Sequence, residues 1–241
     1  MKIRGAHTIL RAVTNSLQIK SLVRSAWCVL ASAALAACPH KSETPTPEPT
    51  APLPTAGIAA QQVGVLPLTL VAAEDSLHWE ALLGERRVVL AKSDSIIGTL
   101  LTTRAPEVTW VLPAELRRAA RRAPGIAPAP DQMGTAILFR PTKQQPEQVP
   151  DPLRSELRTL AALVGGGRYA LIPAGLTFRR TLRPADGRAE SQHPTATAEL
   201  TVVLADVRTG RVGFRTVARG DGDDPWSALT RAMKSLTPGL P

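Results

Sequence analysis

The sequence predicts an α/β domain with a mixed β-sheet, and three observations support this class. A buried apolar strand near residue 63 is followed by helical patterns, further strands and a last helix, so the two element types are interleaved. A turn at Arg208-Thr209-Gly210 joins two long apolar runs, which indicates a hairpin and therefore an antiparallel part of the sheet. Residues 63–241 are enough for one core and show no internal repeat. We expect a single domain there, with helices packed on the sheet.

The first half of the domain begins with an apolar strand. Residues 63–71 are apolar on both faces, as in a buried strand, although Pro67 favours an edge or a bulge. A short helix is predicted at 77–83, and Ser93 or Asp94 is expected to cap a longer one. The remaining elements of this half are a strand at 108–111, a helix at 113–123 that opens on Pro113 and stops at Pro124-Gly125, and a helix at 131–139.

The second half holds the clearest helix, at residues 151–164. We expect Asp151 to cap it, Pro152 to occupy its first position and Gly165 to end it. The strands are predicted at 169–172, 176–182, 198–207 and 211–218, and Gly210 between the last two takes a positive φ. A final helix starts at Asp224-Pro225 and buries Trp226, Leu229, Met233 and Leu236.

Two segments in this order carry a resemblance. The opening strand Val63-Gly64-Val65-Leu66-Pro67-Leu68 and the hairpin Asp206-Val207-Arg208-Thr209-Gly210 resemble those of one fold family. It comprises curli-secretion-channel lipoproteins, penicillin-binding-protein activator lipoproteins and the amino-terminal domain of the Tol-Pal propeller protein. The resemblance covers about residues 63–237 in outline, and segment 74–92 departs from it, because that family runs directly from strand to helix. It implies a fold and no active site.

The amino terminus has the pattern of a targeting segment, residues 1–37. From residue 26 to 37 the chain is apolar or small, which is the length of a signal-peptide core and too short for the ~20 residues of a membrane-spanning helix. Basic residues precede this core without any acidic one: Lys2, Arg4, Arg11, Lys20 and Arg24. The sequence therefore predicts a signal peptide.

The end of that segment, Leu35-Ala36-Ala37-Cys38, resembles the lipobox of bacterial lipoproteins. The resemblance implies cleavage before Cys38, a lipid on its sulfur, and membrane attachment in the cell envelope facing the periplasm. Pro39, and not an aspartate, follows the cysteine, and by resemblance to the sorting patterns of such lipoproteins this implies the outer membrane rather than the inner one. The alternative is an uncleaved hydrophobic amino terminus in which Cys38 is incidental. Cys28 lies in the discarded segment, so the mature chain keeps no thiol for a disulfide, a metal or a nucleophile.

Residues 38–62 are predicted to be a disordered, proline-rich tether. Residues 39–62 include six prolines and offer almost nothing to bury, which favours an extended chain with a reach of up to ~70 Å. Two interpretations of this tether stay open: a functional spacer, and a disordered segment whose length has not been selected. Because the tether is expected to bury nothing, a chain beginning at Val63 is expected to fold alone.

The charge balance argues against nucleic acid as a partner. The whole chain has 29 Lys and Arg against 20 Asp and Glu, a net charge of +9. Removing residues 1–37 takes five positive residues and no negative one, which leaves 24 against 20, or +4. The mature protein is therefore only moderately basic, and an extracytoplasmic location separates it from nucleic acid.

No motif in the chain predicts catalysis, a cofactor or a metal site. Residues 221–224 lack the alternating ligands of a calcium loop and are interpreted as a turn and helix cap. Residues 165–167 end a helix, whereas a phosphate loop opens one. His78 and His193 have no paired ligand nearby, and Glu74, Asp75, Glu80 and Glu85 form no recognisable acid–base pair.

The candidate contact surface is a flank of four arginines on the helix at 113–123. Arg117, Arg118, Arg121 and Arg122 form two pairs spaced by four residues. Such a flank suits anionic lipid headgroups or an acidic protein, and a solvated face is the plainer alternative.

The leading hypothesis is a non-enzymatic interaction module, anchored by its lipid, with an envelope protein partner that the sequence does not identify. It would act in envelope assembly, transport or cell-wall upkeep. The alternatives are an outer-membrane secretion-channel subunit and an enzyme of unrecognised type.

Overall fold

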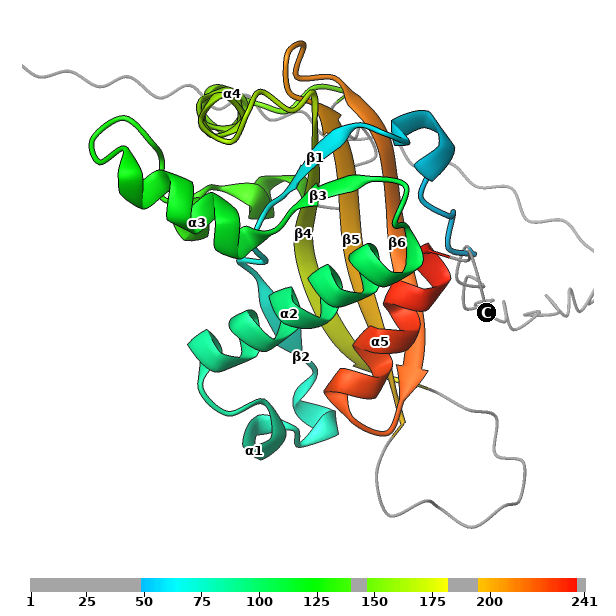
Figure 1. Cartoon of the computed structure of the whole chain (residues 1–241). Coiled ribbons are helices and arrows are strands. Elements are labelled where there is room, and N and C mark those ends of the chain that lie inside the picture. The colour runs from blue at the N-terminus through cyan, green and yellow to red at the C-terminus, as the bar shows by residue number, and fades with distance from the viewer. Residues whose placement is uncertain (1–48, 140–146, 182–194, 238–241) are drawn as a thin grey trace, which may run out of the picture. The chain divides into compact units, whose positions relative to one another are not determined.

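The computed structural model describes residues 49–139, 147–181 and 195–237, which all lie in one unit, Pro47–Pro241. The predicted signal segment 1–37, Cys38 and His193 fall outside the described residues. Within them the predicted α/β class is confirmed, because helices pack on both faces of a mixed sheet (Figure 1).

In the described part of the chain, six strands form one sheet. Across it lie β3 (Thr109–Val111), β1 (Gln62–Val65), β4 (Tyr169–Arg180), β5 (Ala196–Asp206) and β6 (Val212–Gly222), and β2 (Val71–Ala73) also pairs with β4. β1 is parallel to β3 and β4, and β2 is parallel to β4, whereas β4, β5 and β6 are antiparallel. The predicted hairpin turn is confirmed: Gly210 has a φ of 77°, and its amide donates to the Asp206 carbonyl at 2.7 Å.

The opening strand is interrupted at Pro67. The sequence predicts one strand at 63–71, but the structure has β1 and β2 beside β4, separated by residues 66–70. Proline has no amide hydrogen to give to a strand ladder, so the pairing breaks there. The Leu68 amide, which follows, donates instead to the Asp94 carboxylate at 2.8 Å. The predicted irregularity at Pro67 is confirmed, and the single continuous strand is corrected.

The opposite correction applies to β4, which is one strand where two were predicted at 169–172 and 176–182. Its register with β5 shifts between Pro173 and Gly175, so a bulge carries the strand past the irregular residues. A side chain could not replace the hydrogen of Gly175, because a Cβ there would lie 2.6 Å from Cδ2 of Phe139. Gly175 therefore lets an aromatic ring lie directly against the strand.

The two faces of the sheet carry separate apolar clusters, since side chains alternate along each strand. On β5, for example, Val202 belongs to one cluster and Val203 to the other. The first face is covered by α2 (Arg86–Arg104) and α5 (Pro225–Leu236), which lie side by side (Figure 1), and the second by α3 (Pro113–Arg122) and α4 (Leu153–Leu163).

Helix α2 begins earlier than predicted. Ser93 and Asp94, expected to cap it, lie inside the helix and are buried. The start is set by Gly84, whose φ of 65° ends α1 (Glu80–Leu83) just before Arg86. No side chain caps the start of α2, so the usual sequence signal is missing.

Other helix predictions also need correction. The helix at 77–83 is divided into η2 (Asp75–Leu77) and α1, and the helix at 131–139 into η3 (Pro130–Gln132) and η4 (Thr135–Leu138). Asp151 does not cap α4: its carboxylate pairs with the Arg154 guanidinium at 2.6 Å.

The prediction for α5 is largely confirmed. The Asp224 carboxylate accepts the amides of Trp226 at 2.9 Å and Ser227 at 3.1 Å. Trp226 itself is only half-buried, and the Lys92 ammonium lies 4.1 Å from the centre of its ring.

The amino-terminal segment packs against the domain. Leu53 and Ile58, the latter in η1 (Thr55–Ile58), are buried in the cluster beneath α2 and α5. The Leu53 amide donates to the Leu236 carbonyl at 2.8 Å. The expectation that residues 39–62 bury nothing is therefore wrong for Leu53 and Ile58, which are large apolar residues of this proline-rich segment.

The same segment protects an edge of the sheet. β6 is an edge strand, and such strands present unpaired backbone groups. The Thr50 hydroxyl donates to the Val217 carbonyl at 3.3 Å and accepts the Arg219 amide at 3.1 Å, while the Ala51 amide donates to the Thr216 hydroxyl at 3.1 Å. Thr50 and Ala51 thus cover part of β6 through hydrogen bonds that each involve a threonine hydroxyl.

Candidate functional site

The candidate site lies on α3, which begins at Pro113 as predicted. Pro113 and Leu116 are buried, so one side of the helix packs on the second face of the sheet beside α4. Helix α3 ends at Arg122, before the exposed Pro124-Gly125, where Gly125 has a φ of 79°. The side opposite Leu116 is thereby left to solvent.

Arg117, one of the four predicted contact residues, makes ion pairs within the fold. Its Nη2 lies 2.7 Å from Oδ2 of Asp94 and 2.6 Å from Oδ1 of Asp131, and its Nε donates to both oxygens of Asp131 at 2.9 and 3.0 Å. The Asp94 side chain is 7% exposed and that of Arg117 27%. Arg117 therefore joins α2, α3 and η3, and we remove it from the proposed surface.

Asp94 connects this ion pair to the broken strand. One carboxylate oxygen accepts the Leu68 amide, and the other accepts Arg117. Burial raises the pKa of Asp94, and it outweighs the lowering effects of the Leu68 amide and of Arg117. The hydrogen bond with Asp131, and then that with Asp94, raises the pKa of Arg117, so the guanidinium stays charged. The sequence pattern did not predict that Asp94 is a buried hydrogen-bond acceptor. Pro67 was the available signal, because it interrupts the strand and leaves the following Leu68 amide without a strand partner.

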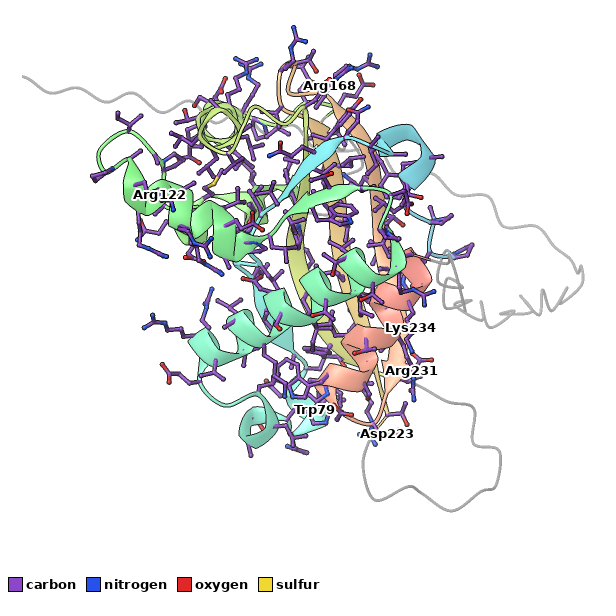
Figure 2. The ribbon with its side chains drawn as sticks, viewed as in Figure 1. Trp79, Arg122, Arg168, Asp223, Arg231 and Lys234 are labelled. Atoms are coloured by element: carbon purple, nitrogen blue, oxygen red, sulfur yellow. The ribbon has the colours of Figure 1, made fainter. Side chains whose placement is uncertain are left out.

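The other three arginines are in a different situation. Arg118, Arg121 and Arg122 are exposed, and none of them makes an ion pair or side-chain hydrogen bond with a residue that the structure describes. Arg122 lies near the end of α3 (Figure 2). Spacings of three and four residues place the three guanidinium groups on one side of the helix.

An exposed isoleucine follows these cations in the chain. Ile126, in the loop after α3, is 73% exposed, more than any other large apolar side chain described as exposed. We call Arg118, Arg121, Arg122 and Ile126 the α3 patch. The three arginines of the patch belong to the flank that the sequence predicted as a contact surface. Ile126 was not predicted, because nothing in the local sequence distinguishes it from a core residue.

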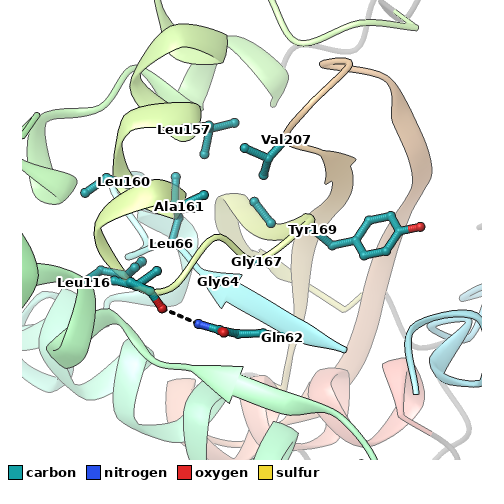
Figure 3. A pocket seen from close by; sticks show the side chains of 12 residues that line it. Gln62, Gly64, Leu66, Leu116, Leu157, Leu160, Ala161, Gly167, Tyr169 and Val207 are labelled. Carbon is teal, nitrogen blue, oxygen red and sulfur yellow. Dashed lines mark hydrogen bonds between the residues drawn. The ribbon is translucent and has the colours of Figure 1, made fainter. Parts of the chain in front are cut away.

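A cavity lies next to α3, between the sheet and α4. Leu66, Leu116, Leu157 and Val207 are among its lining residues, and Gln62 at its rim donates from Nε2 to the Val164 carbonyl at 2.5 Å (Figure 3). Its volume of about 20 Å³ is room for one water molecule, whereas small-molecule sites measure ~300–1,000 Å³. The cavity is a packing gap between apolar side chains.

The other residues that the sequence brought forward have structural positions. Asp224 caps α5, as described, and Gly165 and Gly166 have φ values of 101° and 81° at the end of α4, where the Gly166 amide donates to the Ala161 carbonyl at 2.7 Å. His78 is exposed after η2, and the Glu74 carboxylate accepts the Arg180 amide. Over the described ranges, no group of three His, Cys, Asp or Glu residues is placed to hold a metal ion.

Asp206 also serves the fold. Its carboxylate accepts the amides of Arg208 and Thr209 in the β5–β6 turn, and it pairs with Arg168 at 2.8 Å. Burial opposes its ionisation, but the Thr209 amide, Arg168 and the Arg208 amide outweigh burial and lower the pKa of Asp206. This carboxylate is therefore ionised in the turn that it organises.

Among the helices that the structure describes, none has both the length and the apolar composition needed to cross a bilayer.

No protein-family model matches the chain, and no curated protein matches it. Solved structures do resemble it. The C-terminal domain of LpoB from Salmonella enterica is 14% identical, with 68% of this chain and 83% of that chain covered and a TM-score of 0.34. The PelC dodecamer from Paraburkholderia phytofirmans is 12% identical, with 79% and 94% covered and a TM-score of 0.33. Lipoprotein GNA1162 from Neisseria meningitidis is 13% identical, with 66% and 78% covered and a TM-score of 0.29. At such identities and TM-scores these likenesses transfer no function.

Proposed function

We propose that this protein is a lipid-anchored, non-enzymatic interaction module of the bacterial cell envelope, facing the periplasm. The observation that carries the proposal is Leu35-Ala36-Ala37-Cys38, followed by a proline-rich segment and then a folded domain. The domain supports it through the use of its charged groups: Asp94, Arg117 and Asp224 hold the fold together, while the α3 patch faces solvent. Such a module would act in envelope assembly, transport or cell-wall upkeep through a protein partner, on the outer membrane rather than the inner.

The folded amino-terminal segment shortens the tether. The Thr50 hydroxyl bonds to β6, so residues 39–49 separate the predicted anchor from the packed chain. At ~3.3–3.6 Å per residue, even a fully extended connection from Cys38 to Thr50 spans no more than ~43 Å. The domain would therefore act close to the membrane surface, within about one domain diameter.

Fatty-acid labelling in cells tests the anchor. Cells that produce the full chain are grown with an alkyne-bearing fatty acid, and the protein is then isolated and its label measured. We expect label on the wild type and on Cys28→Ser, whose cysteine lies in the discarded segment, and no label on Cys38→Ser. The two variants remove the same atom from the only two cysteines of the chain. Label on Cys38→Ser, or none on the wild type, would contradict the proposal.

A further inference from the structure

We propose that the α3 patch is a docking site for the anionic phosphate headgroups of the membrane to which the protein is anchored. The inference rests on the proposed anchor for proximity, and on the geometry of α3 for the contact itself. It assigns a bilayer, not an acidic protein, as the partner of this surface.

The charge of the patch matches an anionic headgroup layer. Its three guanidinium groups are exposed on one side of a helix, and the one carboxylate nearby on α3, Glu115, forms no ion pair with them in the described structure. Guanidinium groups bind phosphate oxygens with two parallel hydrogen bonds, and they keep their charge at any physiological pH. Arginines near the end of a helix also interact favourably with its dipole, which explains their stability there but not their grouping with an exposed isoleucine.

Ile126 adds an exposed apolar side chain to the charged patch. A single exposed apolar side chain is common, so Ile126 alone would carry no meaning. Here it lies four residues after Arg122 in the chain, in a loop whose Pro124 and Gly125 are also exposed. A bilayer offers phosphate groups at its surface and an apolar layer a few ångströms deeper, so it can receive both the cations and the exposed isoleucine of this element.

The short connection to the anchor makes a weak contact sufficient. A lipid on Cys38 would hold Thr50 within ~43 Å of the headgroups, and the patch no farther away than that reach plus the width of the domain, so binding would be intramolecular, at a raised effective concentration. Three cations at an anionic surface together strengthen binding on the order of 100-fold. The patch would then orient the domain on the membrane, while the lipid supplies the attachment.

Vesicle binding without the lipid separates this inference from the proposed anchor. The chain from residue 38 with Cys38→Ser keeps every described residue and has no acyl chain. It is mixed with vesicles of phosphatidylethanolamine and phosphatidylglycerol, or with vesicles of phosphatidylcholine alone, and bound protein is measured by sedimentation. We expect binding to the anionic vesicles only, and its loss when salt is raised, because salt screens exposed charges.

Matched variants locate the contact. Replacing Arg118, Arg121 and Arg122 with Gln should weaken binding on the order of 100-fold. The control replaces Arg87, Arg180 and Lys234 with Gln; these residues are also exposed, and the change in net charge is the same. Ile126→Ser should weaken binding, and Leu82→Ser, at another exposed apolar residue, should not. Unchanged unfolding midpoints show that each variant is folded.

A reporter at Pro124 gives an independent measurement. With Cys38→Ser, the chain from residue 38 has no cysteine, so Pro124→Cys takes a single polarity-sensitive dye. Its emission should shift to shorter wavelength on anionic vesicles and not on phosphatidylcholine. No binding of the parent chain, equal losses in the two triple variants, or an unshifted dye would overturn the docking proposal. None of these outcomes affects the labelling of Cys38, which tests the anchor separately.

Discussion

The two faces of the sheet are built differently. Beneath α2 and α5, Leu101, Leu229 and Met233 pack in one apolar cluster that also takes in Leu53 and Ile58. Beneath α3 and α4 the cluster is smaller and includes a water-sized cavity, and the Asp94–Arg117–Asp131 ion pairs lie at the strand break. The first face is stabilised mainly by apolar burial. On the second face, ion pairs of Arg117 also fix the position of α3. The two faces should therefore respond differently to substitution.

The largest effect is expected from removing the amino-terminal segment of the first face. A chain that begins at Gln61 keeps β1 but loses the burial of Leu53 and Ile58. Burying two such side chains contributes ~3–6 kcal/mol, so the free energy of unfolding in urea should fall by about that amount. A chain that begins at Pro49 should be as stable as the mature protein. Equal stability of the two truncated chains would return residues 49–60 to the status of a tether.

A glycine at the contact of β6 with α5 should show how closely the first face is packed. A Cβ at Gly220 would lie 2.1 Å from the backbone nitrogen of Ala232, so α5 must move away. We expect Gly220→Ala to cost ~1–3 kcal/mol, measured by thermal or urea unfolding. Gly213→Ala in the same strand is the control, because its nearest atom would be 3.8 Å away. A similar cost for both would mean that strand glycines, and not the approach of α5, set the effect.

The cap of α5 should contribute less and should depend on pH. Burial opposes ionisation of Asp224, but hydrogen bonds from the Ser227 side chain and from the Ser227 and Trp226 amides outweigh it and lower the pKa of Asp224. Its contribution is therefore present above the ordinary aspartate range and is lost as the pH falls through the lower folded value. Asp224→Ala should cost ~1 kcal/mol at neutral pH. In a series of urea titrations the difference from the wild type should shrink below about pH 4. Asp223→Ala, at an exposed neighbour whose carboxylate accepts the Thr195 hydroxyl, should cost less at neutral pH.

The sequence predicted well what nearby residues decide. Pro113, Gly210 and the pair Asp224-Pro225 set the start of α3, the hairpin turn and the start of α5, because each acts on its own backbone. What the sequence did not predict depends on contacts far along the chain. The start of α2 has no capping side chain, and Leu53 is buried only because α5 ends beside it. In the candidate site, local spacing found four arginines, but only the folded position of Asp94 separates Arg117 from the others.

The central claim is that α3 holds one structural arginine and three free ones, and a comparison of their effects on stability tests it most directly. Urea unfolding is measured for Arg117→Gln and for the variant with Gln at positions 118, 121 and 122. Arg117→Gln leaves the buried Asp94 carboxylate without its cation and should cost ~2–3 kcal/mol. The triple variant should change the free energy of unfolding by less than ~0.5 kcal/mol for each residue. A triple variant that loses as much stability as Arg117→Gln would contradict the account, because the three arginines would then be part of the fold and not a surface free for binding.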